Sequence, residues 1–424
     1  MTQLPSNSAE PRVEFLLDGK ISNLFPEYFN KMVVSESILG KQSNAYFRFV
    51  DPTYSELESM FIDGLSSISF RYGYASGRLT QFKNFIISYY DVTYTAGGVI
   101  IDVWACDKGT LGRTHISTSY GNLSVSDTVK EIVNQNSGVW KLGSLEPTKG
   151  SFGSLQNNIS DIDFLQQECL SKAISLETGR SDYRLYFRNG DELNFRTPDY
   201  GRGIYKTYRV LLDNDHSSMS FKYRVNTLKA FKSGGSKLLV QGYDPIQKEV
   251  LQVNLDDENT DKILLGSKLP SYQFTGGDGR FAHIPFKDFT EVEAYAKQIW
   301  YHNNMSNVTG YLKLDPDPDL EPGRLVNMQV ENMRDGSLLN GSGSYLVEDL
   351  VTTLDASKLV YTSHAIMSKN AMKLGTVTPS GTEVTVTKPA QSPQVTQDSD
   401  IEEPVEVFGG EQQTKKIPIS VGDQ

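Results

Sequence analysis

Leu320-Glu-Pro-Gly-Arg-Leu-Val326 is a short turn sequence between two stretches in which apolar and polar residues alternate. Pro322 fixes its own φ at about −65° and Gly323 tolerates a positive φ, so the pair predicts a tight turn between strands. Gly310-Tyr-Leu-Lys-Leu314 precedes this turn and Tyr345-Leu-Val-Glu-Asp-Leu350 follows it. Because period-two alternation is typical of half-buried strands, we expect an antiparallel β unit in this part of the chain.

The N-terminal part, from Val13 to about Thr118, carries a second set of such runs. Ala45–Phe49 and Ile68–Tyr74 each place apolar and aromatic side chains on one face, as strands that pack on a core do. Thr95-Ala-Gly-Gly98 joins two further runs and has the length and glycine content of a hairpin turn. The sequence therefore predicts a compact all-β unit here.

Three stretches have the apolar period of a helix. Ser124 or Ser126 can cap the first, Ser160 the second and Thr290 the third, because their side-chain oxygens accept from unpaired backbone N–H groups at a helix start. After the second helix, Asn189-Gly190 separates two strand-like runs and predicts a type I′ turn. The expected fold class is mainly β with a few helices (α+β).

The C-terminal β unit is interrupted. It begins near Tyr205, gives way to other material with its own helix, and resumes at Val308. Two similar β units in one chain suggest an internal duplication, which would let a few copies build a ring of doubled order. At 424 residues the chain is also too long for one ordinary core, so several domains are expected.

The net charge of −11 repels phosphate backbones, so sequence-independent binding to nucleic acid is not expected. DNA could still pass through a channel formed by such a surface. From Gly375 onward prolines accumulate and acidic residues outnumber basic ones, which predicts a segment that does not fold alone. The polar start of the chain and the lack of any run of roughly 18–20 apolar residues predict neither a signal peptide nor a membrane span.

No catalytic constellation emerges from the sequence. The histidines lack metal-ligand spacing, and phosphate-loop, dinucleotide-binding and nucleophile-elbow motifs are missing. Asp315–Asp319 resembles the start of a calcium loop, but Leu320 occupies the place of the glycine that such a loop needs, so a solvated loop is favoured. Glu348 and Asp349 are expected on opposite faces of one strand and so not as an acid–base pair. We therefore predict no catalytic, cofactor-binding or metal residues.

Cysteine and tryptophan usage points to packing rather than chemistry. Cys106 and Cys169 are predicted to be buried free thiols. Trp104, Trp140 and Trp300 are expected to pack in cores, although tryptophans in a β-rich protein can also stack on sugars.

Several stretches resemble a known family, the central baseplate hub proteins of contractile-tailed bacteriophages, of which the T-even hub is the best-known example. The resemblance spans about residues 13–370 and extends more loosely to late-control D proteins and type VI secretion spike hubs. The stretches that carry it are Ala45–Asp51 with Ile68–Tyr74, Asp163–Glu168 with Tyr183–Phe187, and Ala294–Ala365. Pro322 and Gly323 lie in the last of these and mark a structural turn.

The resemblance implies a homotrimer in which each protomer contributes two tube-like antiparallel β-barrel domains. Three copies would then form a pseudo-sixfold ring that joins a hexameric tail tube to a trimeric central spike and leaves a channel for DNA. The implied partners are the spike protein, tail-tube or tube-initiator proteins and baseplate wedge proteins. The implied location is the tail baseplate of a virion assembled in the host cytoplasm, with no stable membrane association and no enzymatic role.

Carried onto this chain, the resemblance implies five parts. They are a flexible arm (1–12), a first barrel (13–118), a helix-containing insert (119–202 and 246–304), a second barrel (203–245 and 305–370) and an acidic, proline-containing tail (371–424). The tail departs from the T-even pattern.

Two alternatives stay open from the sequence. The first is a tail-tip or secretion-system hub protein, which would have the same fold. The second, from another class, is a β-rich carbohydrate-binding or glycan-degrading tail protein. The mass of the purified protein separates the classes, because a hub should be a trimer alone or with its spike.

Overall fold

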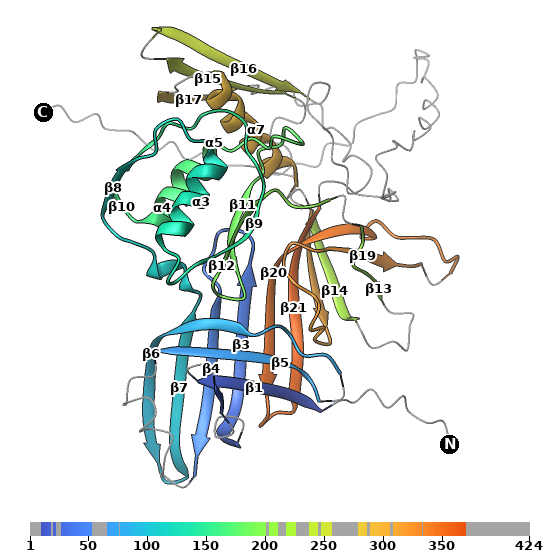
Figure 1. The fold of residues 1–424 in the computed structure, drawn as a ribbon. Coiled ribbons are helices and arrows are strands. Elements are labelled where there is room, and N and C mark those ends of the chain that lie inside the picture. The colour runs from blue at the N-terminus through green and yellow to red at the C-terminus, as the bar shows by residue number, and fades with distance from the viewer. Residues whose placement is uncertain are drawn as a thin grey trace, which may run out of the picture. The chain divides into compact units, whose positions relative to one another are not determined.

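A computed structural model describes most of the chain between residues 10 and 369. The described residues are 10–17, 20–22, 27–52, 66–75, 77–200, 203–210, 218–225, 237–244, 247–256, 279–285, 289–305, 308–332 and 334–369. Most of the expected arm and the whole of the acidic tail lie outside them. Within them the protein is mainly β, with strands β1–β21, three longer helical segments and one short 3-10 helix (Figure 1).

The first β unit has the sheet order β3-β4-β7-β6-β5-β1-β2, and all its pairings are antiparallel. Its strands are β1 (Pro11–Leu17), β2 (Lys20–Ser22), β3 (Phe29–Ser37), β4 (Asn44–Asp51), β5 (Ser67–Tyr74), β6 (Lys83–Thr95) and β7 (Gly98–Cys106). The hairpin predicted at Thr95–Gly98 is confirmed, because these two residues are partners in the β6–β7 ladder.

An aromatic core fills this unit. Phe47 and Phe70 are fully buried, as the alternation predicts, and their ring centroids lie 4.8 Å apart. Phe15 of β1 contacts Phe47 and Phe49 of β4 with centroid distances of 5.6 Å in both pairs, although several strands separate β1 from β4 in the sheet. The sheet must therefore curl over its own core.

The second β unit is built around a core that includes Tyr208, Met328, Tyr345 and Met367. Strands β14, β18, β21, β20 and β19 follow one another as antiparallel neighbours, and β13 pairs with β19 in parallel. The strands are β13 (Lys206–Val210), β14 (Ser218–Val225), β18 (Val308–Leu314), β19 (Leu325–Val330), β20 (Gly343–Asp355) and β21 (Val360–Lys369).

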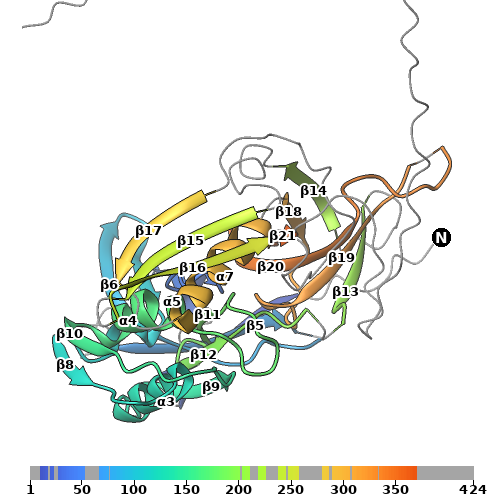
Figure 2. The same cartoon turned by 90° about the horizontal axis from the view of Figure 1, so that it is seen from above.

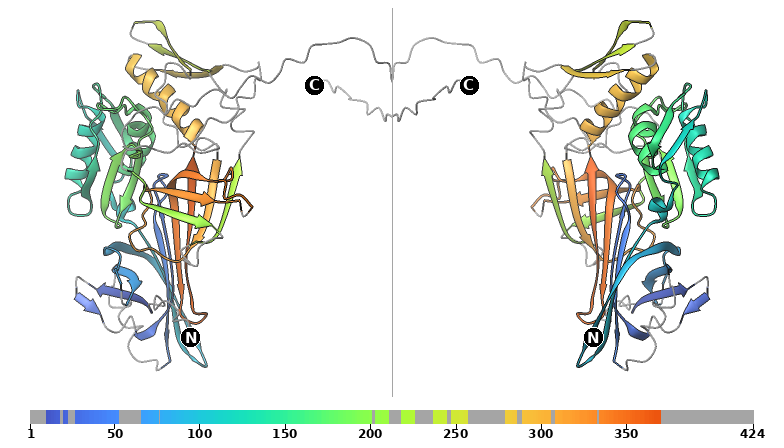
Figure 3. Two further views of the ribbon diagram at one scale, coloured as in Figure 1. Left: turned by 90° about the vertical axis from the view of Figure 1, so that its right-hand side faces the viewer. Right: turned by 90° about the vertical axis from the view of Figure 1, so that its left-hand side faces the viewer.

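Strand β20 belongs to both β units. Its first residues pair with β19, for example Leu346 with Leu325, and its last residues pair with β3, for example Asp355 with Lys31. The two units thus share one continuous 13-stranded sheet, whose strands β3, β20 and β21 run side by side in Figures 1 and 3.

Two closed, tube-like barrels are expected from the resemblance, but the pairings among the described residues close neither unit. Closure needs the first and last strands of a unit to hydrogen-bond. Among the described residues, no pairing joins β3 to β1 or β2 in the first unit, or β13 to β14 in the second. The long strand β20 extends the ladder from one unit into the other. The described architecture is an open, curled sheet that is antiparallel except for the pairing of β13 with β19.

The helix-bearing segment that follows β7 has a separate core containing Trp140, Phe164 and Cys169. Its elements are η1 (Lys108–Leu111), β8 (Ile116–Ser119), α3 (Val125–Gln135), β9 (Lys141–Leu145), β10 (Leu155–Ile159), α4 (Asp161–Phe164), η2 (Leu165–Cys169), α5 (Leu170–Lys172), β11 (Arg184–Arg188) and β12 (Glu192–Arg196). α4, η2 and α5 form one helical run, with a π-helical turn at η2.

Side-chain caps start two of the helices where the sequence predicts them. Ser124 Oγ accepts a hydrogen bond from Asp127 N at 3.1 Å, so Ser124 rather than Ser126 caps α3. Ser160 Oγ accepts from Asp163 N at the same distance and caps α4. Both cysteines are buried free thiols, as predicted.

A three-stranded sheet of order β16-β15-β17 packs against α7 (Figure 2). The elements are β15 (Lys237–Asp244), β16 (Glu249–Asp256), β17 (Gly279–Pro285) and α7 (Phe289–Met305). Val292, Ala296 and Trp300 of α7 are buried against this sheet. α7 begins at Phe289, one residue before the predicted cap Thr290. Residues 286–288, which precede it, are outside the described part of the chain.

The pairing of β15 differs from the expected division of the chain. The expectation puts residues 203–245 in the second β unit and starts the insert at residue 246. β15 and β16 nevertheless pair across that position, from Lys237–Asp256 to Asp244–Glu249. The alternating run in β15 indicated a strand correctly, but alternation does not say which sheet a strand joins.

No helix in the described part of the chain is long and apolar enough to cross a membrane.

Candidate functional site at the junction of the β units

The Pro322–Gly323 turn lies against β20. Gly323 has a φ of +92°, in the region that favours glycine, and Arg324 N donates to Glu321 O at 3.3 Å across the turn. Gly323 N donates to Val347 O at 2.8 Å, and Val347 N donates to Arg324 O at 2.9 Å. The turn is thus fastened to β20 next to the point where that strand changes partner from β19 to β3.

A β-bulge marks the same point of β20. The register against β21 shifts between Val347 and Asp349, and Ile38 N, just after β3, donates to Glu348 O at 3.0 Å. The side chains of Glu348 and Asp349 are both buried but have different partners. Glu348 Oε1 accepts from Ser368 Oγ at 2.8 Å, and Asp349 Oδ2 pairs with Lys41 Nζ at 3.2 Å. Glu348 thus contacts β21 and Asp349 contacts the loop between β3 and β4, and the two carboxylates do not pair with one another.

The Asn189–Gly190 turn fastens the helix-bearing segment to the first β unit. Both residues have positive φ, 53° and 83°, as a type I′ turn requires. Asn84 N at the start of β6 donates to Asn189 O at 2.8 Å, and Lys108 N donates to Gly190 O at 2.7 Å. A Cβ on Gly190 would lie 2.3 Å from Asn84 O, so only glycine permits this approach.

Asp191 completes the contact on the same turn. Its side chain is almost fully buried, pairs with Lys141 Nζ at 2.9 Å and accepts from Asn84 Nδ2 at 3.2 Å. Lys108 Nζ approaches the same carboxylate at 3.8 Å. Of these contacts, those from Asn84 to Asn189 O and to the Asp191 carboxylate cross to the first β unit, whereas Lys108 and Lys141 belong to the helix-bearing segment itself.

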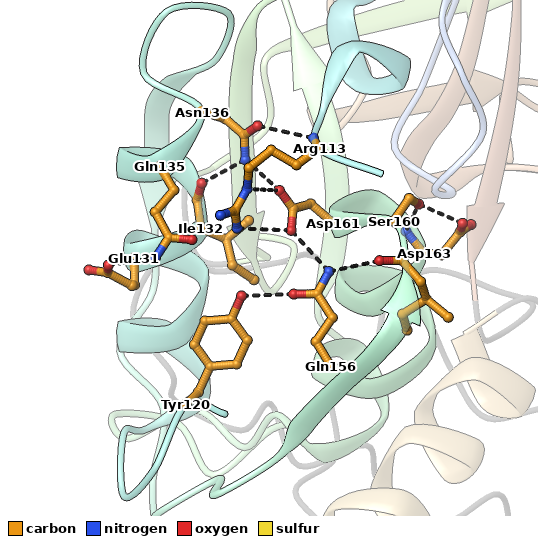
Figure 4. Close-up of polar contacts among 11 residues, drawn as sticks. Arg113, Tyr120, Glu131, Ile132, Gln135, Asn136, Gln156, Ser160, Asp161 and Asp163 are labelled. Atoms are coloured by element: carbon orange, nitrogen blue, oxygen red, sulfur yellow. Dashed lines mark hydrogen bonds and ion pairs between the residues drawn. The ribbon is translucent and has the colours of Figure 1, made fainter. Parts of the chain in front are cut away.

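A second buried carboxylate organises the helix-bearing segment from within (Figure 4). Asp161, at the start of α4, is fully buried and accepts from both Nε and Nη2 of Arg113 at 2.9 and 3.2 Å. Asn136 Nδ2 and Gln156 Nε2 donate to it at 2.7 and 3.0 Å. Tyr120 Oη extends the network by donating to Gln156 Oε1 at 2.8 Å.

Side chains that the sequence analysis considered for chemistry are not brought together. Among the described residues, no group of histidine, cysteine and acidic side chains could hold a metal ion. In the Asp315–Asp319 segment, Asp317 accepts from Tyr205 Oη at 3.0 Å and Asp319 pairs with Arg78 at 2.9 Å. His216 lies outside the described residues.

One of the three tryptophans departs from the expectation of core packing. Trp140 and Trp300 are buried, but Trp104 is only partly buried and points to the face of β7 opposite the aromatic core. Its ring stacks on Tyr89 with a centroid distance of 4.6 Å and an interplanar angle of 18°, and Tyr46 lies on its other side at 5.3 Å. Strand alternation places Trp104 on one face but does not tell which face is the core.

Comparisons with known proteins give a fold but no family. No protein-family model matches the sequence, and no curated protein matches it. Among solved structures the fold is shared with tail proteins, two of them from prophages. At the sequence identities involved, the likeness establishes the fold alone.

Three of these structures illustrate the likeness. The tail protein from Neisseria meningitidis MC58 aligns with a TM-score of 0.60 at 10% identity, over 85% of this chain and 97% of that chain. The 43 kDa tail protein of prophage MuSo2 from Shewanella oneidensis gives 0.56 at 9% identity, over 86% and 100%. Prophage tail protein gp18 from Listeria monocytogenes EGD-e gives 0.50 at 11% identity, over 84% and 94%.

Proposed function

We propose that this chain is a structural protein of a phage tail and, more specifically, the central hub of a baseplate. The observation that carries the proposal is the arrangement of two curled β units on one sheet within one chain, in a fold shared with tail proteins. A non-enzymatic, structural role follows from this assignment.

In this proposal three copies form a ring with pseudo-sixfold symmetry, because each copy contributes two similar units. Residues 13–118 supply the first unit, and residues 203–245 with 305–370 supply the second. Residues 119–202 and 246–304 form the insert, and the pairing of β15 with β16 supports moving Lys237–Asp244 from the second unit to this insert. The ring would join the hexameric tail tube to the trimeric spike in the baseplate of the virion, with wedge proteins at its periphery.

DNA would pass through the ring without binding to it. The net charge of −11 supports this idea, since a conduit that attracted phosphates would retain its cargo. An acidic or neutral channel wall is therefore expected in the assembled ring, and a basic wall would contradict this part of the proposal.

The mass of the full-length protein tests the hub assignment. Light scattering on the purified chain, alone and after mixing with its spike and tube proteins, should give a homotrimer in at least one of these conditions. A chain that stays monomeric with both partners present would refute the assignment. Oligosaccharide hydrolysis by the same sample would contradict the structural role.

A second candidate function rests on the exposed side of β7. Trp104 stacks on Tyr89, which is 55% exposed, and Asp102 lies beside them with Arg48 Nε donating to it at 2.8 Å. An aromatic platform next to paired polar groups is suited to stacking on a sugar ring. Titration with oligosaccharides tests this candidate function. Tyr89→Ala should abolish binding, and the control Tyr94→Ala, at the exposed end of β6, should retain it. Equal binding by both variants would exclude this platform.

A further inference from the structure

A cavity of about 240 Å³ lies where three parts of the described chain meet. Its walls come from β11 and β12, from the end of β3, from the Pro198–Tyr205 stretch as far as the structure describes it, and from the Pro322–Gly323 turn. Sites where separately folded parts meet are common places for ligands, because neither part alone encloses the space. The volume suits a small group rather than a large molecule.

Four arginines line this cavity: Arg184, Arg188, Arg196 and Arg324. Arg184 and Arg188 are four residues apart on β11, so their side chains project from the same face of the strand. Three carboxylates also line it, from Glu36, Asp199 and Glu321. Glu36 is already paired with the buried Lys83 at 2.6 Å, which leaves two carboxylates for four guanidinium groups.

The ion pairs within the cavity are shared or long. Arg188 Nη2 lies 3.0 Å from Glu321 Oε1, and Arg324 Nη2 lies 3.8 Å from the other oxygen of the same carboxylate. Arg196 Nη2 lies 3.6 Å from Asp199 Oδ2. No described carboxylate lies within ion-pair distance of Arg184.

Two guanidinium nitrogens are left buried without a partner. The Nε atoms of Arg184 and Arg188 are inaccessible to solvent and have no hydrogen-bond partner among the described residues. The guanidinium groups of Arg184 and Arg188 are thus not fully satisfied within the protein, and an unsatisfied buried donor on a charged group is costly. The planar guanidinium fork matches the two oxygens of a carboxylate or phosphate.

We propose that this cavity binds an oxyanion, a carboxylate or phosphate group, through Arg184 and Arg188. The group can belong to a small anion or to an acidic side chain of a partner protein, and both share the chemistry that the arginines recognise. Because the cavity walls come from three parts of the fold, the bound anion would also hold these parts together. The inference does not depend on the hub assignment, since binding can be measured whatever the oligomeric state.

Titration of the full-length protein tests the proposal. Inorganic phosphate, citrate and a short acetylated glutamate-rich peptide are titrated separately by calorimetry, at constant ionic strength set with sodium chloride. Saturable binding of phosphate or citrate would support a small anion as the ligand, and binding of the peptide alone would support an acidic segment of a partner protein. No saturable binding of any of the three at millimolar concentration overturns the proposal.

Substitutions locate the binding. Arg184→Gln should weaken the affinity by about tenfold or more, whereas Arg78→Gln should not change it, because Arg78 is exposed and pairs with Asp319. Arg184→Lys keeps the charge but not the fork, and should bind more weakly than wild type even if Arg184→Gln does not fold. If both variants fold and both bind with wild-type affinity, the assignment to Arg184 is overturned. If Arg184→Gln does not fold, wild-type affinity in Arg184→Lys alone overturns it.

Discussion

Replacing Asp161 with alanine should destabilise the helix-bearing segment more than any other single change in its polar network. The carboxylate is fully buried and accepts four hydrogen bonds from Arg113, Asn136 and Gln156 (Figure 4). The side chain of Arg113 is 32% exposed, so about two thirds of it is covered in the folded state. Without the carboxylate, the Arg113 cation loses its partner, and the amides of Asn136 and Gln156 each lose one of their two acceptors.

The expected loss can be worked out from these contacts. Breaking a buried ion pair by removing one partner costs about 3–5 kcal/mol, and an unsatisfied buried donor costs about 1–3 kcal/mol. Because Arg113 can turn partly toward solvent, the terms will not add fully, and we expect about 4 kcal/mol for Asp161→Ala. Asp161→Asn keeps the shape but sets an amide NH2 group against two of the four donors, so its effect should be intermediate.

Fluorescence of Trp140 is the appropriate assay, because this residue lies in the same core and the chain has only two other tryptophans. Urea unfolding is followed in a background with Trp104→Phe and Trp300→Phe, which leaves Trp140 as the reporter. A double-mutant cycle with Arg113→Met should give a coupling energy of about 2–3 kcal/mol. A loss below about 1 kcal/mol for Asp161→Ala, or a coupling near zero, would refute the assigned role.

Three further outcomes are expected. Gly190→Ala should lower the melting temperature far more than Gly121→Ala. Both residues have positive φ, but only a Cβ at Gly190 would meet a backbone oxygen, at 2.3 Å. Equal effects would contradict the role of Gly190 in attaching the turn to Asn84. Lys369 is buried, and burial lowers its pKa to about 8. As the pH rises, the folded state therefore releases this proton before the unfolded chain does. The free energy of unfolding should rise between about pH 8 and 10.5 in the wild type but not in Lys369→Met. Burial raises the pKa of Asp107 to about 6, so the folded state holds this proton more tightly than the unfolded chain does. The urea midpoint of unfolding should therefore fall as the pH rises from about 4 to 6. The same decrease should be missing in Asp107→Asn.

Local signals in the sequence were sufficient for turns, caps and strand faces. Pro322–Gly323 and Asn189–Gly190 form turns because their backbone preferences are set by the residues themselves. Ser124 and Ser160 cap helices for a similar reason, since the hydrogen bond joins residues only three apart. The prediction of a buried face in β4 and β5 also needed only the alternation within each strand.

Features that depend on partners far apart in sequence could not be predicted in this way. The bulge at Glu348 inserts one residue into β20, and an alternation count does not register it. β15 looks like any half-buried strand, and only its pairing shows which sheet it joins. The arginine-lined cavity draws on residues from Glu36 to Arg324, and no spacing in the sequence relates them.

The shared strand β20 has a consequence for how the proposed hub would transmit force. The two β units are joined by a continuous ladder from β19 through β20 to β3, so rotating one against the other would break backbone hydrogen bonds. No strand pairing among the described residues joins the helix-bearing segment to this sheet. It is attached instead through the turn at Asn189–Asp191, a hydrogen bond from Gln166 Nε2 to Gly40 O, and the packing of Tyr186 and Tyr200 against Ile38. In the proposed ring of three such chains, the continuous ladder would therefore fix the angle between the two β units of each chain, whereas turn contacts and side-chain packing would hold the insert.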